Sequence, residues 1–249
     1  DVYKRQGSYS ARSGTLHPRS TLPVYQRQLF PERVFGEGAD DRGVTVWENE
    51  GVRLWNLPEV DAGIAILSVT SKNHTLGAEV LEGILQSVAR AERDFDGLVI
   101  WHDAPFAVGA NLQQVSEACA AGQWDMLEAT VEKFQRTSQS FKYAQIPTVA
   151  AVQGMALGGG CEFLMHASHR VLALESYIGL VEAGVGLIPA GGGSKEFAGR
   201  AAALAARTAT PGEVFPYLQP VFQTIAMAQV AKSAREAVDA GFAREHDIV

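Results

Sequence analysis

The sequence predicts an α/β fold in which strands alternate with helices and pair largely in parallel. Two observations lead to this prediction. Short runs rich in β-branched residues, typical of buried strands, recur along the chain. Longer segments between them carry apolar residues at helical spacing. Alternation of these two element types is typical of layered α/β proteins with parallel sheets.

The expected elements follow from these patterns in chain order. Strands are expected where apolar and β-branched residues run together, at 44–47, 64–69, 98–101 and 148–152. Helices are expected at 76–91, from about 112, at 124–143 and from about 161. The helix at 124–143 stops ahead of Pro147, which cannot continue a helix.

Composition excludes several classes of protein. The chain is 47% hydrophobic and 20% charged, which is a globular balance. Its net charge of −7 disfavours a general binder of nucleic acid or anionic membranes. No apolar run approaches the roughly 18–20 residues that span a bilayer. With 2 Cys and no apolar leader near the start, we expect a cytoplasmic protein without a disulfide framework.

Shifts in composition divide the chain into three parts. Residues 1–6 look like a cloning or sequencing scar and are left out of the fold prediction. Residues 7–43 are rich in Ser, Arg, Pro and Gln with few periodic apolar positions, so we interpret them as a linker. Residues 44–249 hold the alternating strands and helices, and we expect one folded domain there.

Two loops share one local pattern: a buried strand, a loop with glycine, and the start of a helix. The first runs through 106–111 and the second through 158–162. Glycine lets the backbone approach a ligand closely, and the first amides of a helix are unpaired donors. Two such ends would stabilise a developing oxyanion, but ordinary tight turns and helix caps give the same pattern. Neither a P-loop nor a G-x-G-x-x-G motif is present, so a nucleotide site is not predicted.

Two glutamates flank the second glycine loop. Glu162 follows three glycines at a helix start, and Glu182 lies in an apolar, glycine-rich stretch. Partial burial raises the pKa of a carboxyl toward values useful for proton transfer, so the two residues are candidates for an acid/base pair. The alternative is that Glu162 complements the helix dipole and that backbone amides cap Glu182.

The histidines and cysteines predict no metal or nucleophile site. His166 and His169 lie three positions apart, but no third ligand and no H-E-x-x-H spacing accompany them. Cys161 has no histidine in the sequence context of a thiol-protease base, and G-x-S-x-G is absent. We therefore expect no metal in the site.

Three segments together resemble the enoyl-CoA hydratase (crotonase) superfamily. The segment 153–162 is similar to the signature of that family, 106–112 to its first oxyanion loop, and 177–193 to its second-glutamate segment, in the same order. The resemblance runs from about Val44 to the end and implies the crotonase (ClpP/crotonase-like) fold, a spiral of ββα units. Residues 22–31 and 177–182 further resemble bacterial fusions in which a 3-hydroxyacyl-CoA dehydrogenase domain precedes the hydratase, so that 7–43 would join the two.

The resemblance implies a mechanism and an acyl-CoA thioester as substrate. The backbone N–H groups of Ala110 and Gly159 would bind the thioester oxygen, Glu162 would deprotonate water, and Glu182 would protonate the α-carbon. The hydratase step needs no cofactor, and NAD would serve only the dehydrogenase domain. A homo-oligomer or a thiolase partner is expected for the full-length protein. The implied substrate-binding residues lie along the two loops: Ala110, Asn111, Leu112, Gln113, Gly158 and Gly159.

Three departures from the family pattern affect these expectations. Asn111 replaces the usual Asp, which puts a charge contact of the loop in doubt while leaving the backbone donor. Ala190 replaces a frequent Gly, a change that requires a negative φ. The family normally continues through further C-terminal helices beyond Val249, so we expect a truncated domain.

Two other functions remain open on the sequence alone. A Δ3,Δ2-enoyl-CoA isomerase can work with one carboxylate, and the presence of both Glu162 and Glu182 disfavours isomerase activity alone. A non-catalytic acyl-CoA-binding or assembly module is favoured if the two carboxylates lie more than about 10 Å apart or face different cavities, because an acid/base pair acts on one substrate.

Overall fold

The computed structural model describes residues 7–10, 12–18, 43–207 and 213–249, and the chain divides into two compact units, Asp1–Arg42 and Gly43–Val249. In the first unit, β1 (Gly7–Ser10) pairs with β2 (Thr15–Pro18) as an antiparallel hairpin. The sequence analysis did not predict these strands. The segments 1–6 and 22–31, interpreted above as a scar and a family signature, lie outside the described residues.

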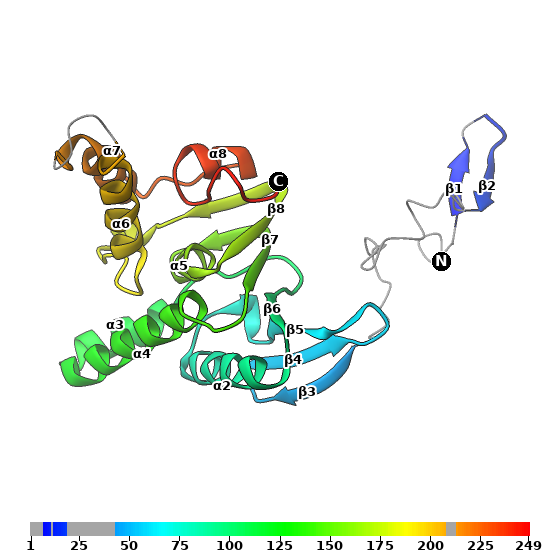
Figure 1. Ribbon diagram of the computed structural model, residues 1–249, viewed down its shortest axis with the longest axis horizontal. Helices are drawn as coiled ribbons and strands as arrows, with labels where there is room; N and C mark the ends of the chain where they lie inside the picture. Colours follow the sequence, from blue (N-terminus) through cyan, green and yellow to red (C-terminus); the bar gives the residue numbers. More distant parts are fainter. Residues whose placement is uncertain (1–6, 11, 19–42, 208–212) are drawn as a thin grey trace. The chain divides into compact units, whose positions relative to one another are not determined.

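The second unit is built on a six-stranded sheet in the order β3-β4-β5-β6-β7-β8 (Figure 1). Its strands follow one another in space as they do along the chain: β3 (Val44–Glu48), β4 (Val52–Leu57), β5 (Asp61–Val69), β6 (Gly97–Ile100), β7 (Thr148–Leu157) and β8 (His169–Gly179).

The prediction of largely parallel pairing is confirmed for β5 to β8 and wrong for β3 to β5. The first three strands pair antiparallel, and the last four pair parallel. The connections at 49–51 and 58–60 are too short for a parallel crossover, which needs about a dozen residues. Strand β4 was not predicted, although Val52 and Leu54 alternate as buried residues of one face.

Helices follow the strands of the parallel half. The four predicted helices are present as α2 (Ala78–Asp94), α3 (Leu112–Ala120), α4 (Trp124–Lys142) and α5 (Gly159–His166). Three further helices were not predicted: α6 (Gly193–Ala205), α7 (Phe215–Ala226) and α8 (Ala234–Asp239). The described residues also include two short 3-10 turns, η2 (Lys72–His74) and η3 (Glu182–Val185). None of the helices among the described residues is long and apolar enough to cross a membrane.

The core forms where the amphipathic face of α2 packs on β4, β5 and β6 (Figure 1). Leu81 and Ile84 of α2 and Leu54 and Leu67 of the sheet are at most 2% exposed. Each such side chain stabilises the fold by about 1.5–3 kcal/mol on burial. Helix α4 packs on both α2 and α5, so it joins the sheet to the region that follows β7.

The parallel half of the sheet fixes the place of the candidate site. Strands β6 and β7 are neighbours and run in the same direction, so their carboxyl ends meet at one edge. The loop after β6 then adds to β7: the Ala107 amide donates to the Met155 carbonyl at 3.0 Å, and the Leu157 amide donates to the Ala107 carbonyl at 2.9 Å. These bonds hold the first glycine loop beside the end of β7, next to the start of α5.

The C-terminal segment closes over β8. Helix α8 packs on β8, the Leu172 amide donates to the Ile248 carbonyl, and the Ile248 amide donates to the Arg170 carbonyl. Arg170 and Asp247 form an ion pair at 2.5 Å with both side chains fully buried. The Arg170 guanidinium also donates to the carbonyls of Leu164 and Ala167, which ties this pair to the end of α5.

Candidate active site

The two glycine loops lie in contact with each other. A Cβ placed on Gly109 would be 3.2 Å from the Gly159 nitrogen, and one placed on Gly158 would be 3.9 Å from the Gly109 Cα. Gly109 and Gly158 have φ values of +90° and +55°, which other residues rarely adopt. The convergence of these two loops, which the sequence only suggested, is therefore a feature of the structure.

Two backbone amides are available where the loops meet. Gly159 is the first residue of α5, where amides have no partner within the helix. Ala110 follows Gly109, whose carbonyl accepts a hydrogen bond from the Leu76 amide at 2.9 Å. Within the described part of the chain, neither the Ala110 N–H nor the Gly159 N–H donates a hydrogen bond. Both donors are free to bind an acceptor that the protein does not supply.

Glu162 lies within the first turn of α5 and is 3% exposed. The Gly193 amide donates to its Oε1 at 2.9 Å. Burial raises the pKa of Glu162 to about 7, the backbone amide of Gly193 opposes the rise, and the negative charge of Glu182 adds to it. A carboxyl with this pKa gains and loses a proton near neutral pH.

Glu182 begins η3 and lies against the second glycine loop. Its Oε1 is 3.3 Å from the point where a Cβ on Gly158 would lie. Its Oε2 is buried and has no hydrogen-bond partner among the residues that the structure describes. Burial raises the pKa of Glu182. A buried carboxyl oxygen without a partner is costly, and it indicates a place that a ligand or water completes.

The residues after Ala110 have local roles at the start of α3. Asn111 caps this helix, because its Oδ1 accepts from the amides of Gln113 and Gln114 at 3.1 and 3.3 Å. A cap requires an oxygen and no charge, which explains how Asn replaces Asp here. The Gln113 side chain donates to Glu117, and Leu112 is exposed. Of the predicted set, the structure therefore gathers Ala110, Gly158, Gly159, Glu162 and Glu182 around the loops.

His166 and His169 have separate environments. His169 is exposed and stacks edge-on with His246. His166 is buried, and its Nδ1–H donates to the Glu162 carbonyl at 2.7 Å, so its Nε2 accepts from the Lys195 ammonium at 3.0 Å. Burial lowers the pKa of His166 to about 4, which keeps the ring neutral.

No group of three or more metal-ligating side chains occurs among the described residues. Burial raises the pKa of the Cys161 thiol well above its usual value. The thiol is therefore not a thiolate near neutral pH, and it lies in the buried face of α5.

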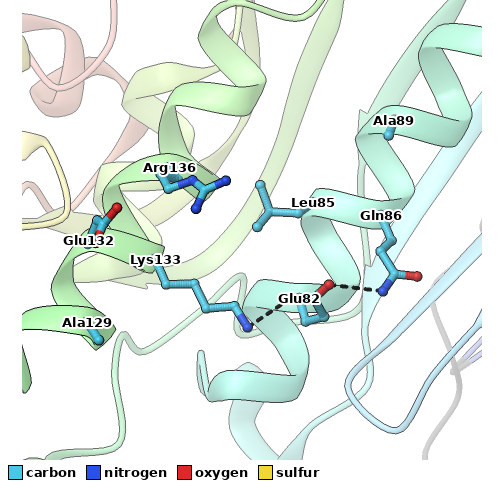
Figure 2. Close-up of a pocket in the computed structure, with 8 residues that line it drawn as sticks. All are labelled: Glu82, Leu85, Gln86, Ala89, Ala129, Glu132, Lys133 and Arg136. Atoms are coloured by element: carbon cyan, nitrogen blue, oxygen red, sulfur yellow. Dashed lines mark hydrogen bonds and ion pairs between the residues drawn. The ribbon is translucent and has the colours of Figure 1, made fainter. Parts of the chain in front are cut away.

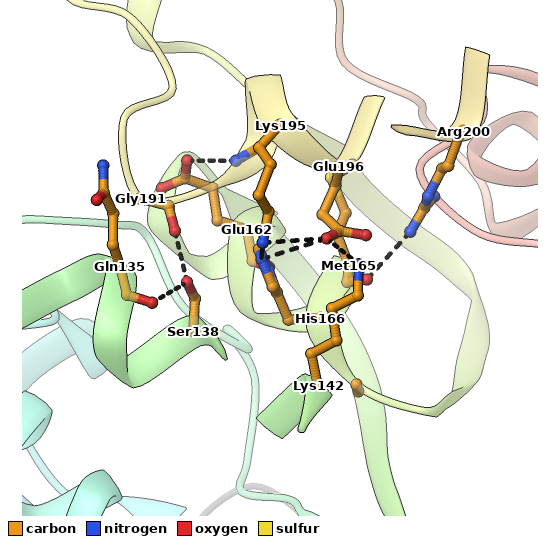
Figure 3. Close-up of polar contacts among 12 residues, drawn as sticks. Gln135, Ser138, Lys142, Glu162, Met165, His166, Gly191, Lys195, Glu196 and Arg200 are labelled. Atoms are coloured by element: carbon orange, nitrogen blue, oxygen red, sulfur yellow. Dashed lines mark hydrogen bonds and ion pairs between the residues drawn. The ribbon is translucent and has the colours of Figure 1, made fainter. Parts of the chain in front are cut away.

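Helix α4 contributes two residues that sequence reasoning missed, and both contact the glycine loop at 190–193 (Figure 3). Ser138 is fully buried and donates to the Gly191 carbonyl at 2.6 Å, and Gln135 donates to the Ala190 carbonyl at 2.8 Å. Ala190 itself does not have a positive φ, so its methyl group is accommodated. The sequence indicates only that Ser138 lies on the buried face of this helix, because it stands at helical spacing between Phe134 and Phe141, and it does not indicate the contact with the loop.

A second group of missed residues lies behind Glu162. Glu196 is 3% exposed and binds the ammonium groups of Lys142 at 2.5 Å and Lys195 at 3.3 Å (Figure 3). These contacts lower the pKa of Glu196 against the opposing effect of burial. The three charges lie on α4 and α6, so the pairs join the two helices beside His166.

An open groove of about 580 Å³ lies between α2 and α4 (Figure 2). An ion pair between Lys133 and Glu82 spans it at 2.9 Å. None of the residues predicted for the site lines this groove. The candidate site is instead the contact region of the glycine loops and the two glutamates.

This arrangement defines a class of protein before any comparison. Two free amides where the glycine loops meet and two buried carboxyls with raised pKa values suit an α/β enzyme that stabilises an oxyanion and moves protons. The family described as enoyl-CoA hydratase/isomerase matches residues 59–211, more than half of the chain, and the chain belongs to that family.

Relatives agree with this assignment. The chain is 34% identical over 209 residues to a probable 3-hydroxyacyl-CoA dehydrogenase of Bacillus subtilis, covering 84% of this chain and 25% of that protein. It is 38% identical over 77 residues to a fatty acid oxidation complex subunit alpha of Colwellia psychrerythraea, covering 31% of this chain and 10% of that protein. The chain thus spans a quarter or less of the length of these curated relatives.

Solved structures confirm the crotonase fold. An enoyl-CoA hydratase from Polaromonas sp. JS666 has a TM-score of 0.61 at 20% identity, with 80% of this chain and 70% of that chain covered. One from Bacillus anthracis has a TM-score of 0.61 at 19% identity, with the same coverage. The crotonase fold implied by the three segments is therefore confirmed.

Proposed function

We propose that residues 44–249 form an enoyl-CoA hydratase domain that adds water to 2-trans-enoyl-CoA and gives 3-hydroxyacyl-CoA. The observation that supports this most strongly is the partnerless, buried Oε2 of Glu182, in a site whose other carboxyl, Glu162, has a pKa of about 7. The negative charge of Glu182 raises the pKa of Glu162, so the two carboxyls act on each other's protonation. That coupling favours an acid/base pair over a binding module.

The proposed reaction begins with the thioester carbonyl between the amides of Ala110 and Gly159. Glu162 takes a proton from water as the water oxygen bonds to the β-carbon. The electron pair of the double bond moves toward the carbonyl oxygen, and the two amides stabilise the resulting enolate. Glu182 then donates its proton to the α-carbon. Its raised pKa favours the protonated form that this step requires.

After the reaction, the protonation states of the two carboxyls are the reverse of those at the start. Glu162 holds the proton from water, and Glu182 has lost one, so a proton must return through solvent before the next turnover. The hydroxyl added at the β-carbon comes from water and the α-hydrogen comes from Glu182, so the net addition after the carboxyls are reset is one water molecule. The step uses neither a metal nor a redox cofactor.

The larger setting of the domain is also part of the proposal. Its relatives include a probable 3-hydroxyacyl-CoA dehydrogenase and fatty acid oxidation complex subunits. We infer that residues 7–43 join it to a dehydrogenase domain, which would use NAD on the 3-hydroxyacyl-CoA product. A role in cytoplasmic β-oxidation, a homo-oligomer and a thiolase partner are consistent with this setting.

The test is loss of the enoyl-thioester absorbance with crotonyl-CoA. Glu162→Gln and Glu182→Gln should each lower kcat by about 10²–10⁴-fold, because each removes a positioned acid or base. Glu175→Gln is the matched control, since Glu175 is an exposed glutamate of β8 that contacts Tyr177 and not the loops. Undiminished turnover in either site variant would contradict the proposed pair.

Isomerase activity is the other outcome of the same experiment. An enzyme that moves the double bond of 3-enoyl-CoA with one carboxyl would lose activity in one variant and keep it in the other. A chain that binds acyl-CoA and turns over neither substrate would be a binding module.

A further inference from the structure

The glycine loop at 190–193 is the element that contacts the Glu162 carboxyl. The Gly193 amide donates to Oε1 at 2.9 Å, and a Cβ on Gly191 would be 2.3 Å from Oε2. The loop backbone therefore lies directly on both oxygens of the carboxyl. The position of the loop therefore determines how many backbone amides face the two oxygens of Glu162.

Helix α4 also contacts this loop (Figure 3). Ser138 donates to the Gly191 carbonyl at 2.6 Å, and Gln135 donates to the Ala190 carbonyl at 2.8 Å. The Ser138 hydroxyl has a second contact, with the carbonyl of Gln135, at 3.0 Å. A hydroxyl has one proton, and the shorter contact is the one to the loop.

The loop is wedged between its neighbours. A Cβ on Gly192, whose φ is +125°, would be 2.6 Å from Cε1 of His166. His166 is itself bonded to the Glu162 carbonyl. Two side chains of α4 anchor the carbonyls of Ala190 and Gly191, and the amides of the same peptides, those of Gly191 and Gly192, support the ionised Glu162 carboxyl.

We propose that Ser138 and Gln135 are positioning residues, which hold the 190–193 loop so that its amides orient the Glu162 carboxyl for proton transfer. This inference rests on the proposed role of Glu162, and it assigns no contact with substrate to either residue. Ser138 is the stronger anchor because it is fully buried and its bond to the loop is the shorter one.

The effect should appear as a change in the protonation of Glu162. Backbone amides of the loop oppose the rise in the pKa of Glu162, which stands at about 7. Without the anchor, the loop donors relax and the charged form loses support, so the pKa rises further. The loss of one hydrogen bond corresponds to a shift of about one pH unit.

The experiment compares the full chain with Ser138→Ala and Thr137→Val. Thr137 is the matched control, because its hydroxyl is equally buried on the same helix but bonds only to the Lys133 carbonyl. Carbon-13 NMR of labelled glutamate carboxyls follows the Glu162 titration. We expect its pKa to rise by about one unit in Ser138→Ala and to stay unchanged in Thr137→Val.

Kinetics give a second readout with crotonyl-CoA. A shift of one unit from about 7 lowers the ionised fraction of Glu162 at pH 7 about fivefold, so kcat should fall about fivefold while KM stays within about twofold. The acid limb of the kcat profile should move up by the same unit. If Ser138→Ala does not fold, Gln135→Met gives the same directions, since it removes the half-buried donor to Ala190.

The two proposals fail in different ways. A Glu162 titration in the folded anchor variant that equals that of Thr137→Val would overturn the positioning role, whatever the activity. If the anchor variant shifts the titration of Glu162 but the wild-type chain has no hydratase activity, the positioning role is supported and the proposed function is overturned.

Discussion

Glu162 shows how two opposing effects set the proton affinity of one side chain. Burial at 3% exposure raises the pKa of its carboxyl, and the amide of Gly193 lowers it, with a net value of about 7. Burial favours the protonated carboxyl, and the loop amides favour the ionised one. The balance places it where a general base works well near neutrality.

This balance predicts the pH dependence of hydration. The ionised form of Glu162 is required, so kcat should rise with pH and reach half of its plateau near the pKa of about 7. The reaction also needs one proton on the pair, so kcat should fall again once both carboxyls are ionised, and the two limbs belong to the coupled pair. Initial rates of crotonyl-CoA hydration against pH measure both limbs, and a profile that is flat across neutral pH would contradict the assignment.

Gly191 offers a test of the contact with Glu162. In Gly191→Ala the new Cβ would be 2.3 Å from Oε2 of Glu162 and 2.4 Å from Phe134, so the carboxyl or the loop must move. We expect a destabilisation of about 1–3 kcal/mol and a loss of kcat of about 10²-fold or more. Thermal unfolding and the hydration assay measure the two effects.

Gly199→Ala is the control for that substitution. Gly199 lies inside α6, and a Cβ there meets nothing within 4 Å. Alanine should stabilise the helix by about 0.5–1 kcal/mol and leave kcat unchanged. Equal losses of activity in the two variants would show that the contact with Glu162 is not the cause.

At the scale of elements, the sequence predicted segments with strong local patterns and missed those that depend on tertiary context. The strand at 148–152 and the helix at 76–91 have clear β-branched or amphipathic patterns, and β7 and α2 confirm them. Strand β8 alternates buried and exposed residues but includes Arg170, whose burial depends on Asp247 far along the chain. No local pattern indicates such a partner.

The residues of the candidate site show the same difference between local pattern and tertiary context. Glu162, Glu182 and the glycine loops were found from motif and composition. Ser138 and Gln135 were not, because their role depends on the packing of α4 against a loop 53 and 55 residues away. A serine inside a helix is ordinary in a sequence, and its meaning appears only when the facing carbonyl is known.

The buried ion pair at the start of β8 predicts a large effect on stability. Asp247→Asn leaves the fully buried Arg170 guanidinium without its counter-charge, and we expect a loss of about 3–5 kcal/mol. Asp239→Asn is the control, because its pair with Arg235 is exposed and should contribute less than about 1 kcal/mol. Denaturant unfolding of both variants measures the difference, and equal effects would contradict the account.

The same pair has a defined pH dependence. The pKa of Asp247 is lowered in the folded chain, chiefly by Arg170 against the effect of burial. Its contribution to stability is therefore present above the unfolded pKa of about 3.9 and is lost as pH falls through the lower folded value. The difference between wild type and Asp247→Asn should shrink in acid.

At the scale of the whole molecule, the chain separates into the units Asp1–Arg42 and Gly43–Val249. All the residues of the candidate site and the six-stranded sheet belong to the second unit. We predict that residues 43–249 alone unfold in one cooperative transition and retain the crotonyl-CoA turnover of the full chain. Circular dichroism and the hydration assay check this, and loss of folding without residues 1–42 would contradict it.

The most direct test of the central claim follows the oxygen of the water. Crotonyl-CoA is incubated with the chain in isotope-labelled water, and the product is analysed by mass spectrometry. The account predicts labelled oxygen on the β-carbon of 3-hydroxybutyryl-CoA with wild type, and about 10²–10⁴-fold slower labelling with Glu162→Gln and with Glu182→Gln. A folded wild-type chain that binds crotonyl-CoA and incorporates no labelled oxygen would contradict it.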